Sequence, residues 1–231
     1  MDALLLLALV YVLAAVPFGV VVTTLYGGDV DLRTSGSGNI GATNVARVFG
    51  WRIAVPVLVL DMAKGLGPVL LARVLWPELW PWFGGIVGAV AFIGHCWPVY
   101  LEFRGGKGVA TGAGAFFGLA PLPTAIAGLV WGAVLAATGR ASLAALVATL
   151  ALVGLVARLA PDVAPVAALL ALGVAIRHIP NIGRLVRGEE GRVVNPAVRW
   201  GRAAPPTAEE ALAEGPSGDR AAGAAWKDER P

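Results

Sequence analysis

The sequence predicts an all-α integral membrane protein with about seven transmembrane helices, because apolar residues gather in runs of spanning length with polar segments between them. Of its 231 residues, 57% are hydrophobic and only 14% are charged, which is less charge than a soluble domain of this length carries. One crossing needs about 20 apolar residues, so the chain can form a single bundle of helices.

The length of each apolar run, and the residues that interrupt it, predict where the helices begin and end. Met1–Val22 lacks a small-residue cleavage site before a soluble domain, so it is interpreted as a retained span and not as a signal peptide. Pro121 and Pro123 interrupt a long apolar run, and we expect two helices with a tight turn there. The other expected helices cover residues 53–75, 79–93, 109–119, 124–137, 142–156 and 163–176.

Most Lys and Arg residues fall on one side of this expected topology. The other side holds only Arg73 and Arg158. By the positive-inside rule the N-terminus is outside and the C-terminus is cytoplasmic. If the break at Pro121 were only a kink, the chain would cross six times, and Arg140 and the segment near Arg177 would lie outside. The distribution of positive charges therefore favours seven crossings. The cytoplasmic cations are Arg33, Arg47, Arg52, Arg104, Lys107, Arg140, Arg177, Arg184 and Arg187.

The composition also indicates the domain organisation and the partners. Residues 1–200 are expected to form one polytopic membrane domain, and residues 201–231, rich in Ala, Gly, Pro and Glu, to form a disordered cytoplasmic tail. The lone Cys96 excludes an intrachain disulfide and a cysteine-built metal site. We expect a monomer in the lipid bilayer, with no metal, no cofactor and no nucleic-acid partner.

A glycine-rich polar loop, residues 33–44, lies between the first two apolar runs. Glycines allow backbone N–H groups to turn inward as an anion nest, and the next helix adds the positive end of its dipole. The loop matches G-x-G-x-x-G at 36–41, but no strand precedes it, so a Rossmann site is rejected. A flexible linker is the alternative, although closely spaced Asn39, Thr43, Asn44 and Arg47 favour an anion site.

Two further polar segments lie on the same expected side. In residues 94–108, Lys107 is set among glycines near Arg104 and can approach a phosphate; positive-inside topology alone is the alternative. A Walker motif is absent, because the required Gly and Ser/Thr positions differ. Three interpretations of His95 stay open: a catalytic acid or base, a hydrogen-bond donor to a phosphate, or a histidine at the membrane interface without a catalytic role.

The third segment, residues 177–185, repeats polar side chains at a spacing of three. His178, Asn181 and Arg184 would share one face of a short helix, with a solvated helix end as the alternative. Asp61 and Lys64 have the same spacing inside an apolar run, where a structural ion pair is the first interpretation.

Together, the segments from Gly36 to Asn44, from Gly94 to Thr111 and from Arg177 to Leu185 resemble the PlsY-type acyl-phosphate:glycerol-3-phosphate acyltransferases. The resemblance covers about residues 3–190 in order and spacing. Trp97 stands where the family commonly has Phe, Arg104 stands where it has Lys, and the tail after Gly191 is longer than usual.

The resemblance implies transfer of a fatty acyl group from acyl phosphate to the 1-hydroxyl of sn-glycerol 3-phosphate, giving lysophosphatidic acid and phosphate in the first acylation step of phospholipid biosynthesis. It also implies a multi-pass protein of the bacterial plasma (inner) membrane with a cytoplasmic active site. Lys107, His178 and Asn181 would be catalytic. The substrate-binding residues would be Ser37, Gly38, Asn39, Gly41, Thr43, Asn44, Arg47, His95, Arg104, Gly106, Ser142 and Arg184.

The resemblance also implies that residues 37–44 hold the acyl phosphate, and that Arg47, Lys107, His178 and Asn181 hold glycerol 3-phosphate or bridge to it. No Ser/His/Asp triad is evident, so direct attack without a covalent acyl-enzyme is expected. The base would be a phosphate oxygen of the substrate, with His178 or His95 as the alternative.

An organophosphate or anion transporter is the competing class of protein, but carriers usually bind their substrates at the midplane between repeats, and no internal repeat is evident. A lipid-head-group transferase would need an acidic metal-binding cluster, which is missing.

Overall fold

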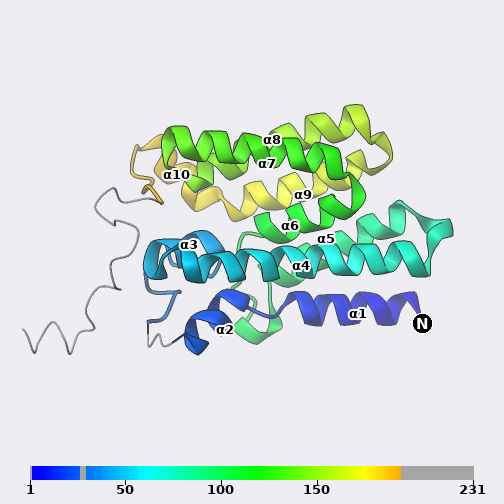
Figure 1. The fold of residues 1–231 in the computed structure, drawn as a ribbon, viewed down its shortest axis with the longest axis horizontal. Coiled ribbons are helices and arrows are strands. Elements are labelled where there is room, and N and C mark those ends of the chain that lie inside the picture. The colour runs from blue at the N-terminus through cyan, green and yellow to red at the C-terminus, as the bar shows by residue number, and fades with distance from the viewer. Residues whose placement is uncertain (1, 27–29, 194–231) are drawn as a thin grey trace, which may run out of the picture. The chain divides into compact units, whose positions relative to one another are not determined.

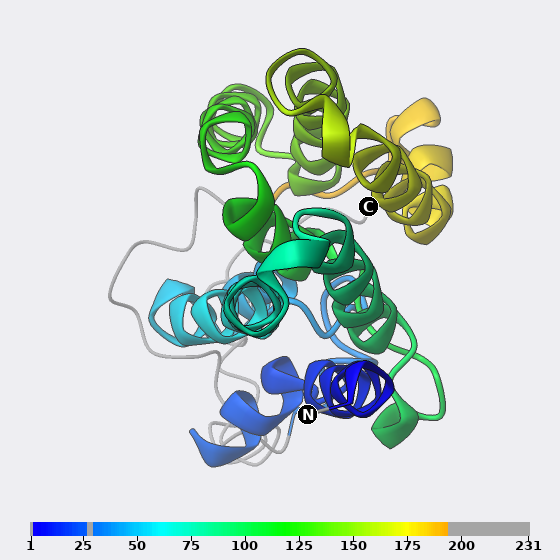
Figure 2. The same ribbon diagram turned by 90° about the vertical axis from the view of Figure 1, so that its right-hand side faces the viewer.

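The computed structural model describes residues 2–26 and 30–193, and every regular element within these ranges is helical. The predicted tail, residues 201–231, lies outside the described residues. In Figure 1 the long helices run side by side, and Figure 2 shows the same bundle from one end. The α-helices are α1 Ala3–Ala14, α2 Phe18–Leu25, α3 Ala42–Phe49, α4 Trp51–Leu75, α5 Trp82–Cys96, α6 Val109–Leu119, α7 Pro121–Thr138, α8 Ala141–Leu159, α9 Ala164–Arg177 and α10 Ile179–Val186.

Four helices of the described chain, α4, α5, α7 and α8, are long and apolar enough to cross a membrane, α5 when extended to Leu101. Two bent pairs raise the number to six if each pair is one span: α1 with α2, bent by 43°, and residues 161–177 with α10, bent by 62°. Helix α6 is apolar but shorter. The protein is therefore a multi-pass helical membrane protein.

Prolines divide two of the apolar runs, one where a break was expected and one where a single span was expected. Pro121 begins α7 directly after α6, which confirms the expected pair of helices. The first apolar run was expected as one span, but it divides at Val16 and Pro17, because proline cannot donate the helical N–H bond. At this break the carbonyl oxygen of Val16 accepts from the ammonium of Lys64 in α4 at 3.0 Å and from the backbone N–H of Phe18 at 3.1 Å.

Helices α4 and α6 lie close together because glycines face each backbone. A Cβ at Gly65 would strike the carbonyl oxygen of Thr111, and one at Gly114 would strike that of Met62. Any larger side chain at either position would force the two helices apart. The contact places the start of α6, and the loop before it, against the middle of α4.

The expected ion pair inside α4 is present and buried. Lys64 Nζ lies 2.8 Å from Asp61 Oδ1, and both side chains are only 3% exposed. His95 of α5 joins them, with its Nδ1 3.6 Å from the same oxygen. Because unpaired charges are costly in lipid, the pair explains how α4 carries two ionisable groups within a span.

Candidate active site

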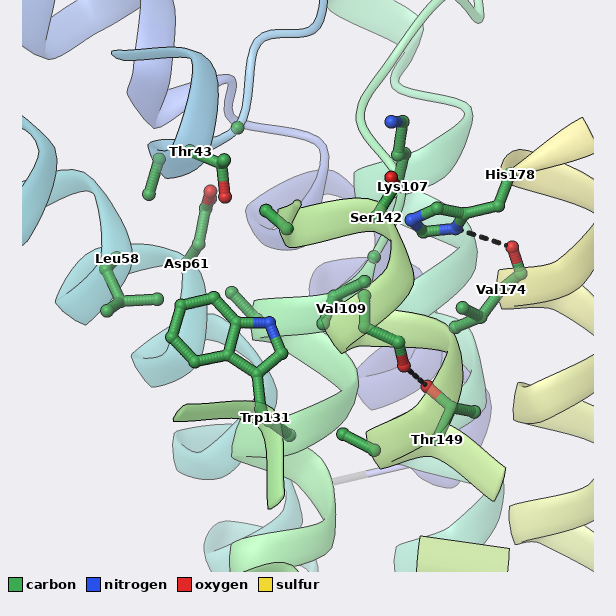
Figure 3. A pocket seen from close by; sticks show the side chains of 18 of the residues that line it. Thr43, Leu58, Asp61, Lys107, Val109, Trp131, Ser142, Thr149, Val174 and His178 are labelled. Carbon is green, nitrogen blue, oxygen red and sulfur yellow. Dashed lines mark hydrogen bonds between the residues drawn. The ribbon is translucent and has the colours of Figure 1, made fainter. Parts of the chain in front are cut away.

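A cavity of about 290 Å³ opens where α6 and α8 begin and α9 ends. Its polar lining comes mainly from these helix ends and from α3, whereas the middles of the helices supply apolar side chains, as Figure 3 shows for labelled members of both sets. The polar lining includes Ser37, Asn39, Thr43, Asn44, Arg47, Asp61, His95, Lys107, Ser142, His178, Asn181 and Glu190. The apolar lining includes Leu58, Met62, Val109, Phe117, Trp131, Leu152, Leu170 and Val174. The cavity can therefore hold a molecule with an anionic head and an apolar tail.

The glycine-rich loop is held in shape by Asn44, which is only 1% exposed. Asn44 Oδ1 accepts from the backbone N–H of Ser37 at 2.7 Å, and Nδ2 donates to the carbonyls of Leu32 and Ser35 at 3.2 and 3.0 Å. Gly36 has a φ of 62° and a side chain there would strike Asn44. The loop therefore has one defined conformation, which presents Ser37 and Asn39 to the cavity.

Helix α3, which we did not predict as a separate element, carries the end of this motif. Its first turn, from Gly41 to Thr43, lines the cavity, so the positive end of the helix dipole faces the space where an anion would bind. Arg47 lies one turn further on and also lines the cavity. Burial lowers the pKa of Arg47 and nearby Arg184 adds to this, against the opposing effect of Glu190, but a guanidinium stays charged at neutral pH.

Lys107 is carried by a loop that packs against the end of α5. The backbone N–H groups of Gly105 and Gly106 donate to the carbonyls of Cys96 and His95 at 3.2 and 3.1 Å. Burial lowers the pKa of Lys107 to about 8, with Arg184, Arg47 and Arg177 adding to the shift and Glu190 opposing it. The ammonium is thus a partly desolvated cation at the mouth of the cavity.

The third motif lies at the bend between α9 and α10: His178 joins the two helices, and Asn181 and Arg184 lie in α10. His178 Nδ1 lies 2.8 Å from the carbonyl oxygen of Val174 (dashed in Figure 3). A carbonyl oxygen only accepts, so Nδ1 carries the hydrogen and Nε2 is left as an acceptor. Asn181 Nδ2 and Arg184 Nε donate to the two carboxylate oxygens of Glu190, each at 2.7 Å.

Glu190, which the sequence analysis missed, lines the cavity and joins α10 to its mouth. Burial raises the pKa of its carboxyl, but the polar hydrogens of Ser142, Asn181 and Arg184 outweigh this and lower it. The only sequence signal was an acid placed just after a basic segment. Asp61, predicted only as half of an ion pair, is a second acid that lines the cavity.

The cavity brings together most of the residues predicted for the site. Those that line it are Ser37, Asn39, Gly41, Thr43, Asn44, Arg47, His95, Lys107, Ser142, His178 and Asn181. Four predicted residues do not. Gly38 is a turn with a φ of 70°, Gly106 packs against the His95 imidazole, Arg104 is exposed, and Arg184 pairs with Glu190.

Comparisons with known proteins identify the family to which the chain is similar. A family model described as glycerol-3-phosphate acyltransferase matches residues 4–188. The glycerol-3-phosphate acyltransferase of Anaeromyxobacter dehalogenans strain 2CP-C is 48% identical over 195 residues, which cover 81% of this chain and 96% of the relative. The corresponding protein of Solidesulfovibrio magneticus is 44% identical over 191 residues, covering 82% and 94%.

Solved structures show the same fold. The crystal structure of PlsY (YgiH), an integral membrane glycerol 3-phosphate acyltransferase, in its glycerol 3-phosphate form matches with a TM-score of 0.80 and 35% identity, covering 87% of this chain and 100% of that one. Its lysophosphatidic acid form matches with a TM-score of 0.76 and 34% identity, covering 83% and 95%. The chain therefore belongs to the glycerol-3-phosphate acyltransferase family.

Proposed function

We propose that this protein transfers a fatty acyl group from acyl phosphate to the 1-hydroxyl of sn-glycerol 3-phosphate, producing lysophosphatidic acid and inorganic phosphate. The observation that carries the proposal is that one cavity combines cations and polar groups at its mouth with apolar side chains within. Structures of the related PlsY in glycerol 3-phosphate and lysophosphatidic acid forms support the acceptor and the product. The donor is proposed from the resemblance of the three motifs to the acyl-phosphate-dependent acyltransferases.

The two phosphates are assigned to neighbouring parts of the mouth. Backbone and side-chain donors of Ser37, Asn39 and Thr43 bind the acyl phosphate at the start of α3. Arg47 and Lys107 bind the phosphate of the acceptor, because two cations are needed to hold a second anion close to the first. The acyl chain lies along the apolar lining of α6, α7 and α8.

The reaction is a direct displacement at the acyl carbonyl carbon. The 1-hydroxyl oxygen forms the new ester bond, the bond from the carbonyl carbon to the phosphate oxygen breaks, and phosphate leaves with the electron pair. A phosphate oxygen takes the hydroxyl proton, with Nε2 of His178 as the protein alternative. Asn181, held by Glu190, orients the acceptor. Cations fixed before reaction stabilise the charge that builds up in the transition state.

We also propose seven crossings, with the N-terminus outside and the C-terminus and the active site on the cytoplasmic side of the bacterial inner membrane. This proposal counts the four long helices, takes each bent pair as one span, and adds α6, which is shorter than the candidate spans, as the seventh crossing. Arg47, Lys107 and Arg184 at the mouth fit the positive-inside rule. Residues 1–200 are the membrane domain of a monomer, and residues 201–231 are a cytoplasmic tail.

The test uses purified protein with labelled glycerol 3-phosphate and either palmitoyl phosphate or palmitoyl-CoA. We expect labelled lysophosphatidic acid from palmitoyl phosphate alone. Lys107→Ala and Asn181→Ala should abolish transfer while the protein stays folded, and activity in both would refute the site assignment. Product from palmitoyl-CoA alone would refute the donor, and uptake of labelled glycerol 3-phosphate into vesicles without any product would favour a transporter.

A further inference from the structure

Arg177, the last residue of α9, contacts the loop that carries Lys107, although about 70 residues separate them in sequence. Its Nε donates to the carbonyl oxygen of Gly106 at 2.9 Å, and Nη2 donates to that of Gly105 at 2.6 Å. The guanidinium also lies over the ring of Trp97, 5.6 Å from its centroid. The guanidinium is planar, donates two hydrogen bonds and lies against an aromatic ring, so it has little freedom to move.

The loop is held equally firmly from the opposite side. The N–H groups of Gly105 and Gly106 are bonded to carbonyls at the end of α5, so both polar groups of each glycine are used. A Cβ at Gly106 would strike the His95 imidazole, so this side offers no space for a shift. Because Lys107 is the next residue, its backbone position follows from these four hydrogen bonds.

Arg177 also links this loop to His178, its neighbour in the chain. His178 lines the cavity, whereas Arg177 does not. Arg177 therefore has the contacts of a residue that acts through the loop and not on the substrate.

We infer that Arg177 is a positioning residue. It fixes the loop of Lys107 against the helix end that carries His178, and so keeps these two side chains at the separation that the acceptor phosphate needs. This inference rests on the proposed function. A displacement of about 1 Å in such a site costs up to roughly a hundredfold in rate, so even a small movement of the loop is measurable.

The decisive variant is Arg177→Lys, which keeps the charge but loses the planar pair of donors. We expect the KM for glycerol 3-phosphate to rise about tenfold or more, with the KM for palmitoyl phosphate changing less than about threefold. Arg73→Lys is the matched control, because Arg73 also lies over a tryptophan, Trp80, at 5.3 Å but does not line the cavity. This control should behave as wild type.

The pH profile separates position from charge. Lys107 is faced by Arg47, Arg177, His178, Arg184 and Glu190. Arg177→Lys keeps this set of charges, so the fall in kcat/KM at alkaline pH should stay at the wild-type pH while its height drops. Arg177→Gln removes a neighbouring positive charge, so the same fall should move to higher pH.

Hydrogen exchange tests the inference without activity. In detergent, the amides of residues 104–110 should exchange faster in Arg177→Lys, and those of α8 should not. Unchanged exchange, or an equal loss of kcat/KM for both substrates, would overturn the inference.

If Arg177→Lys does not fold, Trp97→Leu takes its place. A smaller rise in the KM for glycerol 3-phosphate is expected for Trp97→Leu, and an unchanged KM would overturn the inference. Wild-type protein without transferase activity refutes the proposed function instead.

Discussion

At the scale of single residues, Lys107 combines a proposed role in phosphate binding with an environment that makes its charge easy to lose. Its pKa, lowered to about 8 mainly by burial, lies far below that of an exposed lysine. The ammonium form is complete well below pH 8 and disappears as the pH rises through this value. Binding of an anion to Lys107 should therefore weaken within the range of an ordinary assay.

We predict that kcat/KM for glycerol 3-phosphate falls about tenfold for each pH unit above about 8, because this quantity reports ionisation of the free enzyme. Initial rates at low acceptor concentration from pH 6 to 10 measure it. Lys107→Arg keeps a positive charge throughout this range, so its residual activity should lack the fall. A wild-type profile that stays level to pH 10 would contradict the assignment of Lys107 to the phosphate.

Asn44 shows how a residue of a binding motif can act on the loop itself. We predict that Asn44→Ala lowers the free energy of unfolding by about 1–3 kcal/mol, because buried loop carbonyls lose their donor, and that it lowers activity as well. Thermal unfolding in detergent measures the first effect. Asn39→Ala is the paired control: Asn39 lines the cavity, so its loss should change KM and leave the unfolding temperature in place.

The sequence predicted the residues of the mouth better than their individual roles. Lys107, His178 and Asn181 could be named because they lie in short segments that charge and spacing single out. Sequence spacing does not show that Asn44 turns inward to the loop, or that Arg184 is engaged by Glu190, because both depend on the path of the chain between motifs. The catalytic roles assigned to Lys107, His178 and Asn181 stay predictions.

At the scale of elements, apolar length located the long helices to within a few residues, and Pro121 located the division between α6 and α7. Helix α3 was missed because eight residues of mixed polarity show no spanning run. The break between α1 and α2 was missed because the apolar run continues across it, and its contact with Lys64, from a distant helix, is not visible in the sequence. Local patterns do not contain such contacts.

The close contact of α4 with α6 gives a prediction at this scale. Gly65→Ala should lower the unfolding temperature, by about 1–3 kcal/mol in free energy, because the new methyl group meets the backbone of Thr111. Gly67→Ala is a control on the same helix, where a Cβ meets nothing within 4 Å, and it should leave stability unchanged or raised. Equal effects of the two changes would show that the helices are not in close contact at Gly65.

At the scale of the whole molecule, the mouth of the cavity is assembled from helix ends contributed by nearly the whole described chain. The proposed orientation places this mouth in the cytoplasm. Because the only cysteine, Cys96, is buried, introduced cysteines can report the side on which they lie.

We predict that a membrane-impermeant maleimide labels the Asp162→Cys variant in intact spheroplasts, and labels the Thr34→Cys variant only after permeabilisation. Both positions are exposed, and the proposed topology puts them on opposite sides. Labelling of both variants in intact cells, or the reverse pattern, would refute the orientation. Unmodified protein, with its buried thiol, is the blank.

The ion pair between Asp61 and Lys64 has a consequence for how the protein enters the membrane. Each charge alone would oppose insertion by about 2.5–3.5 kcal/mol near the centre of a helix. Because the two side chains are three residues apart on α4, they can neutralise each other as soon as that helix coils. During biogenesis the middle of α4 can therefore enter the membrane with these two charges already paired, which leaves only Arg52 and Arg73, near the ends of the helix, as unpaired charges of α4.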